Sequence, residues 1–393
     1  MSVFKTLLAF LLSALLVACS SPDNSEPPAE LTEIENPLVL NIDWSIDTGE
    51  GIHLTSFNMS PLLISDMIYS IDTLGIIQQI DPVSGRRQWS FESGLKSISG
   101  LAGNTEILIA SSREGEIIAY NLPPRNAQSN GRKIKGGLKK RWQKLVHSEI
   151  RATPLIDGDD LYVRTVNGKL IKLSLNTGKT LWSVNRRVPA LSLTGNSRPL
   201  VFEDMVISGF DNGKISAFLR ENGQTEWEGV VARPKGRTEI ERLVDIDGQF
   251  ILRDGIIYAS SFQGKLVAIQ AHSGNILWSR NFSSHQSMIA DQQALYLTDE
   301  RSHLWSIDRR TGSALWKQEV LNARKTTAPQ MVGDQLVVAD LEGYVHFFDK
   351  QDGKLIGRIE ASYSRHISQP LVYKNKVLVQ DSTGVLSAIS SKP

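Results

Sequence analysis

The chain has 393 residues, of which 41% are hydrophobic and 22% are charged, which is ordinary for a soluble globular protein. Its 43 basic and 42 acidic residues leave a formal net charge of +1, which excludes the strongly basic surface of a typical nucleic-acid-binding protein. A single cysteine, Cys19, excludes an intramolecular disulfide framework.

Residues 1–18 have the composition of a signal peptide. Lys5 supplies the positive charge, and residues 7–17 form an apolar stretch too short to span a bilayer. The Leu-Val-Ala-Cys sequence that ends at Cys19 resembles a bacterial lipobox, in which the cysteine is lipidated and becomes the first residue. Because Ser20 and not aspartate follows it, the resemblance implies sorting to the outer membrane. We therefore expect a chain anchored by lipid on the periplasmic face of that membrane.

Residues 19–37 are rich in Ser, Pro, Glu and Asn, a composition that predicts a flexible tether. The remainder, residues 38–393, is predicted to form one domain because a single repeat runs through it.

The repeat is a Gly turn followed four residues later by a Trp, and it recurs about every 45 residues. Short runs rich in Val, Ile and Tyr lie between X-Gly pairs, a pattern that predicts antiparallel hairpins. Four such strands in 40 to 50 residues are typical of a propeller blade. The Gly–Trp pairs are Gly85–Trp89, Gly178–Trp182, Gly223–Trp227, Gly274–Trp278 and Gly312–Trp316.

Eight blades follow from counting the Trp positions, with Gly357 in the place of one Trp. The last repeat, residues 369–389, ends after its third strand, whereas residues 38–44 form a lone strand with no blade before it. The sequence therefore predicts an all-β fold, an eight-bladed β-propeller closed by its N-terminal strand, which removes the free sheet edges. We expect the Trp rings to wedge between neighbouring blades, apart from Trp305, which is out of register.

No residue pattern predicts catalysis. The seven histidines lack metal-ligand spacing, and the acidic residues form no recognisable calcium loop, so we assign no catalytic residue, metal or cofactor. One basic insertion, residues 121–141, could contact anionic lipid or an acidic partner, or it could be a solvated loop.

The repeat resembles two families of PQQ-like repeat propellers. One is the quinoprotein alcohol dehydrogenases, whose repeat contains stretches like Asn-Thr-Gly-Lys-Thr-Leu-Trp at residues 176–182. Many of those enzymes carry an adjacent cysteine pair that this chain lacks. The other is the BamB family, the propeller lipoproteins of the outer-membrane β-barrel assembly machine. That resemblance covers essentially the whole chain, including the lipobox and the tether.

Membership of the BamB family would imply a non-catalytic scaffold. Its partners would be the core barrel subunit BamA, the rest of the complex and unfolded outer-membrane proteins, with a lipid anchor in the membrane and no nucleic acid. The resemblance is most specific in residues 188–195 and 235–247, which are not part of the repeat. It implies partner-binding roles for Leu191, Leu193, Thr194, Asp245 and Asp247, although Thr194 stands where the family has arginine.

Physical reasoning supports these two segments without deciding their role. Exposed leucines beside charged residues are typical of an interface, but both leucines could instead pack onto the blade. The aspartates could equally cap turns or pair with Arg242. A quinone-dependent dehydrogenase-like propeller and a general periplasmic binding propeller are the alternatives.

Overall fold

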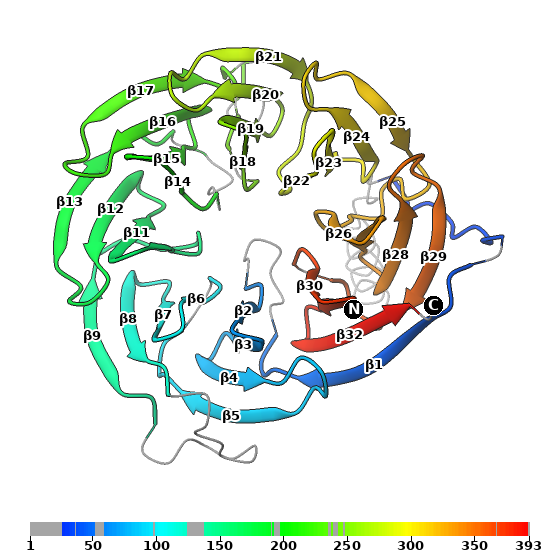
Figure 1. Cartoon of the computed structure of the whole chain (residues 1–393), viewed down its shortest axis with the longest axis horizontal. Coiled ribbons are helices and arrows are strands. Elements are labelled where there is room, and N and C mark those ends of the chain that lie inside the picture. The colour runs from blue at the N-terminus through cyan, green and yellow to red at the C-terminus, as the bar shows by residue number, and fades with distance from the viewer. Residues whose placement is uncertain are drawn as a thin grey trace, which may run out of the picture.

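The computed structural model describes residues 26–35, 37–51, 59–96, 99–123, 137–189, 191, 197–234, 237–238, 243–246, 248–366 and 368–391. Within these residues, 32 strands form eight four-stranded antiparallel sheets, arranged as blades around a central axis (Figure 1). The predicted eight-bladed, all-β propeller is confirmed. No helix among the described residues is both long and apolar enough to cross a bilayer.

Each blade uses consecutive strands, and the first of them lies nearest the axis (Figure 1). Blades 1 to 4 contain, in order, β2 (Leu62–Ile64), β3 (Met67–Ile71), β4 (Ile76–Ile80), β5 (Arg87–Glu92); β6 (Ala102–Gly103), β7 (Ile107–Ser111), β8 (Glu116–Asn121), β9 (Lys140–Leu145); β10 (Leu155–Asp157), β11 (Asp160–Arg164), β12 (Lys169–Ser174), β13 (Thr180–Asn185); β14 (Leu200–Phe202), β15 (Met205–Gly209), β16 (Lys214–Leu219) and β17 (Thr225–Val230).

Blades 5 to 8 follow the same plan, except that the outermost strand of blade 8 comes from the N-terminal end. They contain β18 (Ile251–Arg253), β19 (Ile256–Ser260), β20 (Lys265–Gln270), β21 (Ile276–Asn281); β22 (Ile289–Ala290), β23 (Ala294–Thr298), β24 (Leu304–Asp308), β25 (Ala314–Gln318); β26 (Gln330–Val332), β27 (Gln335–Ala339), β28 (Tyr344–Asp349), β29 (Leu355–Glu360); β30 (Leu371–Tyr373), β31 (Lys376–Gln380), β32 (Val385–Ser391) and β1 (Leu40–Asp47).

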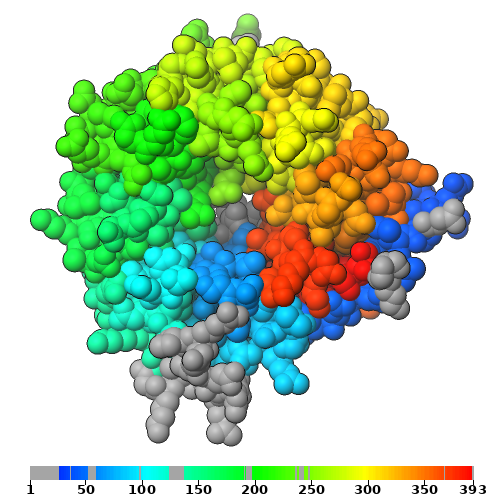
Figure 2. Space-filling model, viewed as in Figure 1, coloured from blue at the N-terminus to red at the C-terminus, as the bar shows by residue number. Residues whose placement is uncertain are grey.

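The ring closes as the sequence predicts. Strand β1 pairs antiparallel with β32, in a register that runs from Leu40 opposite Ser391 to Asp47 opposite Val385. The blue start and the red end of the chain accordingly lie side by side in Figure 2. Because this pairing completes blade 8, no blade of the described ring lacks its outer strand.

The predicted Trp wedges are confirmed, and they explain the Gly turns more fully than the sequence did. The ring of Trp227 in blade 4 lies against Gly274 of blade 5, where an added Cβ would come within 2.6 Å of the ring. Its indole N–H donates to the Ala271 carbonyl at 2.9 Å. Gly274 also has a φ of +72°, so the turn needs glycine for its backbone and for the space. The same pairing joins Trp44 to Gly85, Trp142 to Gly178, Trp182 to Gly223, Trp278 to Gly312 and Trp316 to Gly353.

Two blade junctions depart from this rule for structural reasons. Blade 8 has no turn between its third and fourth strands, because the fourth is β1, so a Trp in blade 7 would have no Gly to meet. Gly357 takes that position, and the space beside it is filled by Leu38 and Leu40. In blade 2 the equivalent turn is replaced by the basic insertion, and Trp89 keeps the contact with a tyrosine of its own blade that Trp182 and Trp278 also make, with 6.0 Å between the ring centroids of Trp89 and Tyr69.

Candidate functional site

The strand order gives the ring two faces that carry different loops. In an antiparallel blade, the loop between the second and third strands and the connection to the next blade emerge at the same end. We call this end the loop face, and the opposite end, with the two remaining kinds of turn, the turn face. Both segments singled out in the sequence fall between the last strand of one blade and the first of the next, so their described residues belong to the loop face. The basic insertion joins β8 to β9 and belongs to the turn face; its residues 124–136 lie outside the described ones.

Leu191 lies in the connection between blades 3 and 4 and is 42% exposed. The start of this connection is fixed, because Val188 packs where a Cβ on Gly168 would lie, 2.7 Å from its methyl group. The end is fixed at Ser197, which is fully buried. Leu193 and Thr194 lie outside the described residues.

Residues 243–246 of the second segment are packed into the ring. Leu243, Val244, Asp245 and Ile246 are all buried, with Asp245 and Ile246 at 0% exposure. The Asp245 carbonyl accepts a hydrogen bond from the Phe262 N–H at 3.1 Å. The side chain of Asp245 is therefore inaccessible in this conformation, which the sequence did not indicate, and Asp247 lies outside the described residues.

The two segments meet at one point of the fold. A Cβ on Gly209, at the end of β15, would lie 2.8 Å from Ile246 and 3.2 Å from Ser197. Two connections separated by about 50 residues in sequence thus converge on one glycine of blade 4. We call this neighbourhood the docking surface: Leu191 is its exposed residue, and Ser197 and residues 243–246 form its buried base.

A buried ion pair, which sequence reasoning missed, supports this surface. Arg164 of blade 3 pairs with Asp211 of blade 4, and their side chains are only 2% and 1% exposed. Arg164 also donates to the Ser197 hydroxyl at 3.4 Å. The pair therefore links two blades directly beneath the Leu191 connection. Sequence alone could not find it, because the two residues lie 47 positions apart in different repeats.

A cavity of about 440 Å³ lies on the same face, between the loops of blades 5 to 8. Its lining includes Lys325, Arg365 and His366. Burial lowers the pKa of His366, which favours the neutral imidazole near pH 7.

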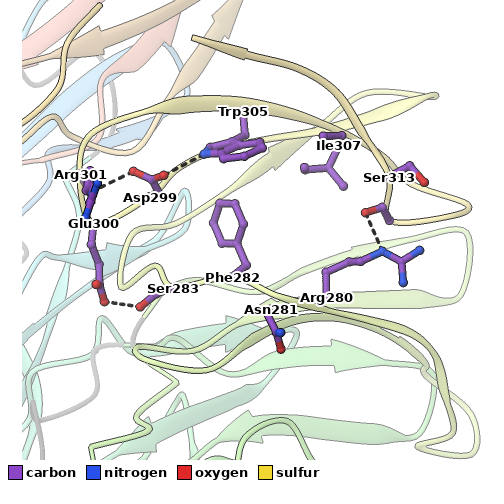
Figure 3. A pocket seen from close by; sticks show the side chains of 12 residues that line it. Arg280, Asn281, Phe282, Ser283, Asp299, Glu300, Arg301, Trp305, Ile307 and Ser313 are labelled. Carbon is purple, nitrogen blue, oxygen red and sulfur yellow. Dashed lines mark hydrogen bonds between the residues drawn. The ribbon is translucent and has the colours of Figure 1, made fainter. Parts of the chain in front are cut away.

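A second, larger pocket of about 600 Å³ lies between blades 5 and 6 (Figure 3). Its aromatic wall consists of Phe282 and the out-of-register Trp305, whose ring centroids are 5.7 Å apart at 75°. The Trp305 N–H donates to Asp299 at 2.9 Å. Arg280 borders the other end and donates to the Gly312 carbonyl at 3.1 Å. These side chains suit the binding of an apolar or aromatic group.

The described residues contain no group of three or more His, Cys, Asp or Glu side chains placed to hold a metal ion. The fold, the Trp–Gly junctions and the loop face define an eight-bladed propeller of PQQ-like repeats.

Comparison with known proteins narrows this class. The family model described as "Outer membrane protein assembly factor BamB" matches residues 73–318 and 306–392. The chain is 30% identical over 401 residues to the BamB of Shewanella oneidensis, with 98% of each chain covered. It is 29% identical over 404 residues to that of Escherichia coli K12, with 99% of this chain and all of the relative covered. The chain belongs to the BamB family of outer membrane protein assembly factors.

Solved structures agree with this assignment. The crystal structure of BamB from Moraxella catarrhalis superposes with a TM-score of 0.77 at 25% identity, covering 90% of this chain and all of that one. The quinohemoprotein alcohol dehydrogenase of Comamonas testosteroni reaches 0.69 at 11% identity, covering 90% of this chain and 77% of its own. That second likeness establishes the shared propeller fold alone.

Proposed function

We propose that this chain is a non-catalytic scaffold, lipid-anchored through Cys19 on the periplasmic face of the outer membrane. It would bind the periplasmic domains of the core barrel subunit BamA and aid insertion of β-barrel outer-membrane proteins. Family membership supports a role in outer membrane protein assembly.

The observation that carries the proposal is the exposed Leu191 above a rigid base. A leucine that is 42% exposed on an interblade connection gains free energy when a partner covers it. The convergence at Gly209 and the Arg164–Asp211 pair hold Ser197 and Ile246 in place at the base of that connection.

The remaining residues of the two segments are assigned on different grounds. Asp245 would act by holding residues 243–246 in the base, since its side chain is buried. Leu193, Thr194 and Asp247 stay proposed contacts on the strength of the family resemblance.

We further propose that unfolded clients add a strand to the outer edge of a blade. Strand β21 suits this role, because four of its six residues are exposed and it ends at the pocket bordered by Phe282 and Trp305. Charged substitutions along β21 should reduce client cross-linking; unchanged cross-linking would contradict this part of the proposal.

Affinity purification from solubilised outer membranes tests the central claim. Leu191→Glu should lose the core barrel subunit, because a carboxylate would be buried against the partner without compensation. Leu181→Glu is the matched control, since Leu181 lies on the outer strand of the adjacent blade and is 48% exposed. Equal recovery with wild type and Leu191→Glu would refute the docking surface. Failure of the wild type to recover the subunit would refute the proposed scaffold function. Calcium-dependent binding of pyrroloquinoline quinone would then favour the dehydrogenase-like alternative.

A further inference from the structure

Part of the predicted tether is bound to the propeller. Residues 26–35 and 37–38, which we call the strap, form no strand but lie along blade 7. The Ala29 N–H donates to the Asn322 carbonyl at 2.9 Å, and the Asn322 side chain donates to Glu26 at 2.8 Å. Further along, Arg358 donates to the Thr32 carbonyl at 2.8 Å, and the Leu38 N–H donates to the Ile356 carbonyl at 2.8 Å.

A buried arginine receives the strap. Arg324 is 2% exposed and donates to Asp340 at 2.7 Å and to Glu342. Its remaining terminal nitrogen donates to the Ala29 carbonyl at 2.8 Å. Without the strap this nitrogen would lose that acceptor, and hydrogen bonds from charged donors contribute more than neutral ones. Ala29, Leu31 and Ile34 are half-buried along the same path, so apolar contacts add to the hydrogen bonds.

The strap has a definite direction. Asn322 and Arg324 belong to the connection between β25 and β26, which lies on the loop face. Strand β29 runs from the turn face to the loop face, and the strap passes Arg358 before it reaches Ile356 near the start of that strand. The strap therefore enters at the loop face, descends the outside of blade 7 and delivers the chain to β1 at the turn face.

We propose that the strap turns the loop face of the propeller toward the lipid surface. This inference rests on the proposed lipid anchor at Cys19. Only seven residue steps separate Cys19 from Glu26, so the strap entry lies at most about 25 Å from the anchored residue. A free tether attached only at Leu40 would allow about 75 Å and would start from the turn face. Docking of the strap thus shortens the maximum distance between the anchored residue and the propeller about threefold. It also moves the point of attachment from the turn face to the loop face.

The geometry separates anchoring from docking on one face. The strap follows blade 7, whereas the docking surface lies on the connection between blades 3 and 4, across the ring (Figure 1). A partner could therefore occupy the docking surface without contacting the strap. The cavity bordered by Lys325 and Arg365 would open on the same, membrane-facing side.

Hydrogen exchange on the mature lipoprotein in detergent micelles tests strap docking. The Ala29 and Leu38 amides, which donate to the Asn322 and Ile356 carbonyls, should exchange at least about tenfold more slowly than in an unstructured peptide. A double Asn322→Ala, Arg358→Ala variant, which removes the side-chain hydrogen bonds to Glu26 and Thr32 and keeps the backbone ones, should reduce this protection while the blade strands keep theirs. Arg280→Ala is the matched control, because Arg280 also donates to backbone carbonyls of a neighbouring blade but not to the strap. An unprotected peptide 26–38 in the wild type would overturn the proposal.

Energy transfer from single labelled cysteines to acceptors on lipid headgroups tests the orientation. In the lipidated chain the sulfur of Cys19 is blocked, so an introduced cysteine is the only thiol. Tyr363→Cys labels the loop face at a residue that is 95% exposed, and Val83→Cys labels the turn face at one that is 56% exposed. In vesicles, transfer should be stronger from Tyr363→Cys. A 20-residue Gly-Ser insertion after Ser25 should abolish the difference and leave the strap protected.

The outcomes separate this inference from the proposed function. Equal transfer from the two positions, or stronger transfer from Val83→Cys, would refute the orientation. A chain that did not attach to vesicles would refute the lipid anchor and the orientation together, while the exchange experiment would still decide whether the strap is docked. Loss of BamA binding by Leu191→Glu bears on neither result.

Discussion

The Trp–Gly junction between blades makes a quantitative prediction, because blade 5 contains two glycines with the same backbone and different surroundings. Gly274 and Gly255 both have a φ of +72°. An added Cβ on Gly274 would lie 2.6 and 2.7 Å from two ring atoms of Trp227, whereas one on Gly255 would meet nothing within 4 Å. Substituting alanine at each position therefore separates backbone strain from the steric clash.

The expected losses of unfolding free energy differ severalfold. Gly255→Ala should cost about 1 kcal/mol, because an L residue is strained in the left-handed region. Gly274→Ala incurs the same strain and must also displace Trp227, which is 9% exposed and hydrogen-bonded to Ala271. Overpacking of this kind costs about 1 to 3 kcal/mol, so the total should be about 2 to 4 kcal/mol.

Urea unfolding followed by circular dichroism measures both losses as shifts in midpoint at constant m-value. The cause is isolated by a double-mutant cycle with Trp227→Ala, which removes the ring. In that background Gly274→Ala should cost only about 1 kcal/mol, the backbone strain alone. Equal losses for the two glycine variants, or an undiminished loss without the ring, would refute the wedge as the reason for glycine.

Three further predictions concern other contacts. Asp211→Ala should lower the free energy of unfolding in urea by about 3 to 5 kcal/mol, because it leaves Arg164 buried without its carboxylate partner. Asp334→Ala, which removes the exposed partner of Lys350, should lower it by less than about 1 kcal/mol. Similar losses for the two variants would contradict this prediction. Burial lowers the pKa of His346, despite its hydrogen bond to Asp340, and burial also lowers the pKa of His366, so the unfolded chain binds more protons than the folded one near these pKa values. The free energy of unfolding should therefore fall as the pH drops through 6.5, the usual histidine pKa, and His366→Asn should weaken this pH dependence. A free energy of unfolding that did not change with pH in the wild type would contradict this prediction. Removing residues 26–47 should expose the edge of β32 and cause self-association visible by light scattering, while a monomeric product would show that closure by β1 is dispensable.

The sequence predicted the features that recur and missed those that occur once. The blade count, closure by the N-terminal strand and the Trp wedges follow from local spacing repeated along the chain. The buried position of Asp245 could not be predicted, because it follows from the packing of its neighbour Ile246 into the core between blades 4 and 5.

The docked strap was missed for a related reason. A segment rich in Pro, Glu and Ser has the composition of a free linker, and contacts with distant residues such as Arg324, 295 positions away, hold it. Trp305 was noticed as out of register, but its pocket needs Phe282 from the neighbouring blade. Contacts of this kind carry no periodic signal.

The pairing of β1 with β32 also sets the order in which the chain can fold. Leu40 and Ser391 are partners in that ladder, so the first blade-forming segment has no permanent neighbour until the last has been made. Seven blades can form from contiguous stretches of chain, but the eighth requires a loop closure across nearly the whole length, and such contacts form slowly. Until that step the two ends present unpaired strand edges, the state in which a β-rich chain is most prone to associate. A chaperone that protects this protein would therefore be needed longest at its two ends.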